Sequence, residues 1–193
     1  MKFIIFLFLL MFAKNILADD ISDFQIEGMS IGESLLNFFT QSEINKSIID
    51  YPYKDDEFVD VEIYDYINFK TYEGMQITFK KNDNQFIIYG LTGFNFYEEN
   101  IDECFDKVDV VAKEINSLFK NTDREDKRQK HKGDPSGQSI VKTVQFWFEN
   151  NDVVTVECWD WSSEMTEQYK YTDNFGVTIL HNDLVFWLNN KAY

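Results

Sequence analysis

Apolar and polar positions alternate along several stretches of the chain, and this pattern predicts mostly β-structure. The segment from Phe58 to Phe69 reads FVDVEIYDYINF, in which the two kinds of side chain take turns as they do in a half-buried strand. Two shorter runs, 75–80 and 86–91, flank the turn residues 81–84 and predict a hairpin. The second half adds four expected strands, at 140–149, 153–161, 177–180 and 184–188.

Two segments show helical signals instead. Ser30 and Glu33 match a capping box, which predicts a helix over about 31–46. Asn100 begins a second helix that extends to about Lys120, because apolar side chains recur there at helical spacing. The polar, charged segment 121–139 that follows is expected to form a mobile loop.

Strands that come in runs, rather than alternating with helices, favour an α+β fold with antiparallel sheet and two helices. The segment Gln76–Phe79 is echoed by Gln145–Phe148, and each is followed by an Asn-Asp turn and preceded by a helix. This echo suggests a duplicated helix-plus-β-hairpin unit. We therefore expect a single α+β domain over 19–193, with candidate halves 19–97 and 98–193.

The N-terminus has the pattern of a secretory signal peptide. Lys2 precedes an apolar run from Phe3 to Ala13, and Ile16 and Ala18 suit the −3 and −1 positions of a cleavage site. The run is shorter than the roughly 20 residues that a membrane-spanning helix needs. We expect cleavage after Ala18 and a periplasmic or secreted protein with no stable membrane anchor.

The charge of the chain limits its partners. The formal net charge is −16, which repels phosphate backbones and anionic lipid surfaces. Nucleic acid is therefore excluded as an expected partner, whereas cations and basic protein surfaces remain open. A hydrophobic content of 44% provides enough apolar side chains for a packed core.

The register of the expected 140–161 hairpin decides where its cysteine points. A three-residue loop at 150–152 places one wholly apolar face on the two strands, whereas a two-residue loop mixes acids into it. That face contains Val144, Phe146, Phe148, Val154, Val156 and Cys158. Cys104 lies on the apolar stripe of the second helix, so we expect a Cys104–Cys158 disulfide in an exported chain. Both cysteines, with His131 and His181, are zinc-ligand types, but their spacing matches no compact zinc motif.

The opposite face of the same hairpin is the candidate ligand face. It contains Trp147, Trp159 and Trp161 with Gln145 and Glu157. Two readings stay open. Another element could cover these rings as ordinary core, or they could form an exposed aromatic platform beside acids, of the kind that sugars and peptides bind.

Motifs for catalysis are weak. Gly28-Met29-Ser30-Ile31-Gly32 matches the G-x-S-x-G nucleophile elbow, but no parallel βαβ series surrounds it, so Ser30 is interpreted as a helix cap. The overlapping Gly32-Glu33-Ser34-Leu35 is similar to the GDSL block of SGNH-type esterases. Glu33 replaces the Asp of that block, and the Asp-x-x-His pair of that family is missing.

Acidic residues are too numerous for spacing to nominate a catalytic pair. The densest cluster, residues 54–57 with Asp60, could bind calcium through oxygen ligands or form a solvated loop. It lacks the turn glycine and alternating spacing of a calcium loop. We predict no catalytic residue, metal site or cofactor.

Two resemblances cover longer stretches. The runs FQIEGMSIGESLLNFF and YEGMQITFKKNDNQFIIYGLTG, with the NIDECFDKVD helix, are similar to small exported proteins of unknown function from marine alphaproteobacteria. That resemblance covers most of the mature chain and implies no activity. Gly28-Met29-Ser30 before a meander also resembles the helix-plus-sheet domains of outer-membrane assembly lipoproteins, whose lipidated cysteine is absent here.

Together these features predict an exported, disulfide-linked α+β protein that binds an unknown ligand or protein partner rather than catalysing a reaction. The alternatives are a carboxylate-dependent, carbohydrate-active hydrolase and an envelope-assembly or inhibitor-like factor.

Overall fold

The computed structural model describes residues 20–193, apart from residues 52, 65 and 98. The expected signal peptide and its cleavage point lie outside these residues. Within them, no helix is both long enough and apolar enough to cross a membrane.

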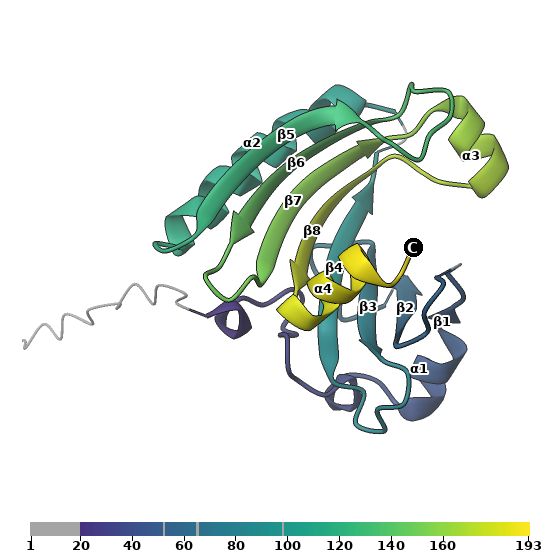
Figure 1. Ribbon diagram of the computed structural model, residues 1–193, viewed down its shortest axis with the longest axis vertical. Coiled ribbons are helices and arrows are strands. Elements are labelled where there is room, and N and C mark those ends of the chain that lie inside the picture. The colour runs from purple at the N-terminus through teal and green to yellow at the C-terminus, as the bar shows by residue number, and fades with distance from the viewer. Residues whose placement is uncertain (1–19, 52, 65, 98) are drawn as a thin grey trace, which may run out of the picture.

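One open sheet of eight antiparallel strands forms the centre of the protein, in the order β1-β2-β3-β4-β8-β7-β6-β5 (Figure 1). The α+β class with antiparallel sheet is thereby confirmed. The described part of the chain contains four α-helices, however, and not the two that we expected.

The elements have the following bounds. The strands are β1 (Ile48–Ile49), β2 (Phe58–Tyr64), β3 (Gly74–Lys80), β4 (Ile88–Phe96), β5 (Asp123–Lys130), β6 (Ile140–Trp147), β7 (Val153–Asp160) and β8 (Asn174–Leu180). The helices are α1 (Gln41–Lys46), α2 (Ile101–Leu118), α3 (Ser163–Tyr169) and α4 (Asn182–Asn190), with short 3-10 turns at Ile21–Asp23 and Leu35–Asn37.

The sheet consists of two four-stranded meanders that meet at its centre. Strands β1 to β4 come from the first candidate half and β5 to β8 from the second, and β4 pairs with β8. In the two meanders β3 and β7 occupy equivalent positions, each next to a strand of the central pair. The echo between 76–79 and 145–148 instead equates β3 with β6, so it does not mark equivalent positions, and the duplicated unit stays a prediction.

One face of this sheet carries the main core. Alternate residues of six strands point to it, as the period of two along a strand requires. Helix α2 packs on this face against β6, β7 and β8, and the segment before α1 covers the first half. The strand residues buried there include Val61, Ile77, Leu91, Val144, Phe146, Val156, Phe175 and Val177.

The hairpin β6–β7 confirms which face is apolar but corrects its register. Phe146 pairs with Val154 and not with Val156, so the loop is 149–151 rather than 150–152. Asn151 occupies the left-handed region, with φ of 67°, as one residue of such a loop must. A shift of two residues leaves the faces unchanged, because side chains alternate with a period of two.

A disulfide joins Cys104 of α2 to Cys158 of β7, as expected. Both residues are fully buried, and the bridge attaches the helix directly to the sheet that it covers. Such bridges are typical of proteins that fold in an oxidising compartment.

Removing this bridge should weaken the fold. In a Cys104→Ala/Cys158→Ala variant we expect the free energy of unfolding to fall by about 2–4 kcal/mol, because the unfolded chain regains loop entropy. Urea unfolding followed by circular dichroism measures the change. Reduced wild-type protein is the control and should behave like the variant; equal stability of all three samples would contradict a structural role for the bridge.

The expected helix over 31–46 does not form. Gly32 has φ of +85°, and the backbone of 32–35 pairs with residues 86–88, next to β4. Helix α1 begins only after Thr40, which forms a complete capping box with Glu43. Glu33 does accept a hydrogen bond from the Ser30 amide, but it closes a turn and caps no helix. Pairing with the hairpin therefore outweighs the local helix signal.

Two other expectations fail in the second half, and one helix was not predicted. Residues 123–130 of the expected loop form the edge strand β5, whose charged side chains are a common protection for an exposed edge. The expected strand 184–188 is part of α4, in which Leu184, Trp187 and Leu188 share one side of the helix. Helix α3, capped by Ser162, was not expected at all.

Candidate functional site

The second face of the sheet is only partly covered, and it forms the floor of a large open cleft. Helix α4 lies over part of this face, near β3, β4 and β8, while α3 extends from the far end of β7 (Figure 1). The hollow between them has a volume of about 1160 Å³. Ligand sites are usually concave, with a few polar groups among apolar ones, so this cleft is the candidate site.

Aromatic rings line the side of the cleft that belongs to β7 and α3. The rings of Trp159 and Trp161 stack with centroids 5.0 Å apart, and Tyr171 follows at 4.6 Å from Trp161. Tyr169 stacks on Tyr171 in turn. His131 contacts both tryptophans, and its Nδ1 atom is buried with no hydrogen-bond partner among the described residues.

A second aromatic group lines the side that belongs to β2 and α4. Tyr53 lies at its centre, with ring centroids 4.8 Å from Trp187 and 5.6 Å from Tyr193. The ring of Tyr51 packs against that of Tyr53, with centroids 5.5 Å apart. The C-terminal residue is thus part of the cleft wall.

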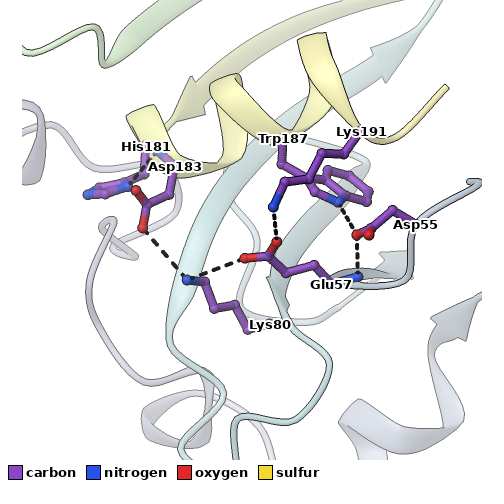
Figure 2. A network of polar contacts seen from close by, with 7 residues as sticks. All are labelled: Asp55, Glu57, Lys80, His181, Asp183, Trp187 and Lys191. Atoms are coloured by element: carbon purple, nitrogen blue, oxygen red, sulfur yellow. Dashed lines mark hydrogen bonds and ion pairs between the residues drawn. The ribbon is translucent and has the colours of Figure 1, made fainter.

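Polar contacts fix α4 in place beside this second group (Figure 2). The indole N–H of Trp187 donates to Asp55 Oδ1 at 2.6 Å, and Lys191 Nζ lies 3.0 Å from Glu57 Oε2. Lys80 lies 3.7 Å from a carboxylate oxygen of both Glu57 and Asp183. The hydrogen bond from Trp187 lowers the pKa of Asp55, so this carboxylate is ionised at neutral pH.

Loss of the Asp55 carboxylate should loosen α4. In an Asp55→Ala variant the indole N–H of Trp187 loses its acceptor, and we expect amides of 182–190 to exchange with deuterium several-fold faster while core strands are unchanged. Asp56→Ala is the matched control, because among the described residues its carboxylate pairs with the exposed Lys81 and no other cation. Equal exchange in both variants would show that Asp55 does not hold the helix.

Two acids of β2 point into the cleft. Asp60 is 2% exposed and accepts hydrogen bonds from the hydroxyls of Tyr53, at 3.0 Å, and Thr78. Burial raises its pKa, and these hydrogen bonds oppose the rise. Glu62, two residues further along the same strand, accepts from the hydroxyls of Tyr51, at 3.1 Å, and Tyr64.

A third acid, Glu157 of β7, lies on the cleft floor. Thr178 of β8 donates its hydroxyl to Glu157 Oε1 at 3.1 Å and is itself within 3.0 Å of the Thr92 hydroxyl. Gly176 pairs with Glu157 in the neighbouring strand, and the carboxylate lies over the space that a side chain there would fill. Desolvation by burial raises the pKa of Glu157 to about 6.

This raised pKa predicts that the charge of Glu157 costs stability at neutral pH. The folded state binds its proton more tightly than the unfolded state, so the contribution of this group to stability is full below about pH 4.5 and is lost as the pH rises through 6. A Glu157→Gln variant should therefore be more stable than wild type at pH 7, by about 1–2 kcal/mol. The difference should vanish near pH 4, and thermal melts at both pH values test this; a variant less stable at pH 7 would contradict it.

The structure brings some of the expected ligand residues together and separates others. Trp159, Trp161 and Glu157 line the cleft. Gln145 lines a smaller neighbouring hollow of about 360 Å³, which shares Trp159 and His131 with the cleft. Trp147, at the other end of the same sheet face, lines neither hollow. The smaller hollow carries lysines 127, 130 and 132, so the charge along this face changes sign at Trp159.

The acids and tyrosines of the first half were not expected at this site. Asp60, Glu62 and Tyr64 alternate with apolar residues in β2, so their common face was readable from the sequence. The sequence did not reveal that β4 pairs with β8, and this pairing brings the polar face of β2 into the same cleft as β7. The tyrosines of 169–171 and Tyr193 gave no local signal of a site.

The other candidate chemistry finds no support in the geometry. Ser30 is 5% exposed and lies in a turn, so it is not the open nucleophile of a hydrolase elbow. The disulfide occupies both cysteines that a zinc site would need. His181 caps α4 through Nδ1. Within the described residues, no three or more His, Cys, Asp or Glu side chains are grouped to hold a metal ion.

No protein-family model, curated protein or solved structure matches this chain. The similarity to exported alphaproteobacterial proteins therefore stays a prediction, and function is inferred from the chemistry of the cleft.

Proposed function

We propose that this chain is an exported binding protein that holds a ligand in the cleft between α3 and α4, without transforming it. The observation that carries the proposal is the concentration of exposed aromatic rings in one hollow. Of the eleven large apolar side chains exposed in the described residues, five line the cleft, and all five are aromatic: Tyr64, Phe96, Tyr169, Tyr171 and Tyr193.

Exposed aromatic rings gathered in a concave site usually mark a surface that binds a ligand or another protein. The remaining exposed apolar residues are spread over separate segments, at 36, 48, 67, 110, 118 and 186. This distribution favours a ligand in the cleft over a broad protein interface of the kind an assembly factor uses.

The placement of the acids favours binding over carboxylate-dependent hydrolysis. A glycosidase needs two accessible carboxyl groups about 5–9.5 Å apart. Asp60 and Glu62 are neighbours on one strand face, but Asp60 is almost fully buried and both its oxygens accept hydrogen bonds from the protein. Glu157 is four strand spacings from β2, about 19 Å along the sheet.

A ligand screen tests the proposal. We expect compounds of one chemical class, in a panel of organic amines, oligosaccharides and short peptides, to raise the melting temperature of the protein. Trp159→Ala and Trp161→Ala should each weaken binding of such a compound by several-fold to about tenfold, since loss of one aromatic contact costs about 0.5–1.5 kcal/mol beyond the buried area.

Trp147→Ala is the matched control, because Trp147 shares the sheet face but lies outside the cleft. Its variant should bind as wild type does. Equal weakening by all three substitutions would place the ligand elsewhere. Inaccessibility of Trp159 and Trp161 to acrylamide, with no compound stabilising the protein, would overturn the binding function.

A further inference from the structure

We infer that the ligand of the cleft is a linear organic polyamine, with one ammonium group at Glu157 and another near Glu62. This inference rests on the proposed binding function and names the class of ligand. Three features of the cleft support it: its unpaired negative charge, its aromatic walls and the direction of its polar floor.

The cleft carries more negative charge than the protein neutralises. Asp60, Glu62 and Glu157 line it, whereas Lys170 is the only lysine or arginine among its described lining residues. None of the ion pairs in the described part of the chain involves these three carboxylates. A charge held in a desolvated site without a partner is costly, and a bound cation would relieve that cost.

The carboxylates of the cleft have lone pairs free to accept hydrogen bonds, which favours a ligand that donates them. The hydroxyls of Tyr51 and Tyr64 donate to Glu62, and that of Thr178 donates to Glu157. Carboxylates only accept, so their remaining lone pairs suit a ligand rich in N–H groups. A neutral sugar could stack on the same rings, but it would leave the negative charge uncompensated.

The aromatic walls suit a cation with apolar segments. Ammonium groups bind favourably over the faces of Trp and Tyr rings, and methylene chains pack on the same surfaces. Trp159 lies in the same strand as Glu157, two residues away, and Tyr64 both donates to Glu62 and lines the cleft. Each acid therefore has an aromatic ring beside it.

The floor of the cleft sets the direction of an elongated cation. Thr178, Thr92 and Gln76 form a row of neighbouring polar residues that connects the Glu157 side of the sheet to Glu62. In the opposite direction, beyond Trp159, the smaller hollow is lined with lysines and would repel a polycation. A polyamine would thus extend from Glu157 toward β2.

Spermine, a tetraamine long enough to extend from β7 to the acids of β2, is the probe for this inference, measured by isothermal titration calorimetry and tryptophan fluorescence. At about 0.15 M salt, where diffuse surface attraction is screened, we expect saturable binding to the wild-type protein. Glu157→Gln and Glu62→Gln should each weaken it by about tenfold or more, because each removes one carboxylate partner of an ammonium group.

Glu149→Gln is the matched control, since it removes the same charge at an exposed position outside the cleft. Its affinity should equal that of wild type, and equal weakening in all variants would reduce the effect to net charge and overturn the inference. Thermal melts establish that each variant is folded.

Maltotriose, a neutral probe, separates this inference from the function on which it rests. Absence of spermine binding would overturn the cationic ligand, and binding of maltotriose in the cleft in its place would leave the binding function intact. Failure of spermine, together with failure of the whole panel and inaccessible tryptophans, would overturn both.

Discussion

Strands β4 and β8 pair over seven residues at the centre of the sheet, and among the described strands this is the one pairing that joins the two four-stranded meanders. It aligns residues that are far apart in the chain, so that Thr92 lies opposite Thr178. The same alignment makes the apolar sides of both meanders one continuous core. It also makes their polar sides one floor, on which acids of β2 and β7 face a common cleft. The core and the candidate site are therefore two consequences of a single strand pairing.

The two faces of the sheet differ in how they are covered. Helix α2 covers the β6–β8 half of one face, and the disulfide between Cys104 and Cys158 holds the helix to it. On the other face, large aromatic rings remain in contact with solvent. The same face carries Glu157, and burial raises the pKa of its carboxyl group. Neither feature stabilises the folded chain by itself. Features that cost stability and are gathered in one hollow are expected where a protein binds something, because a ligand can supply the missing contacts.

Much of the cleft depends on elements that have little to do with the main core. Helix α4 packs Leu184 and Trp187 in a small separate cluster with Phe58, and polar contacts from Asp55 and Glu57 hold its outer side. Helix α3 and the tyrosines that follow it extend one aromatic wall beyond the sheet. The shape of the cleft is therefore set by α3, α4 and the residues that hold them as well as by the sheet.

The sequence by itself determined the strand-rich class, the helix over 101–118, the apolar face of the β6–β7 hairpin and the pairing of its two cysteines. Each of these depends on local periodicity, which side-chain burial imposes directly on the order of residues. Tertiary structure decided the rest: it drew residues 32–35 away from a helix and into pairing beside β4, made the charged segment 123–130 an edge strand, and folded 182–190 as a helix. It also decided that Trp159 and Trp161 share a cleft with Tyr53 and Glu62 while Trp147 does not. Local pattern cannot give these results, because which strands are neighbours, and which face stays uncovered, depends on contacts between residues far apart in the chain.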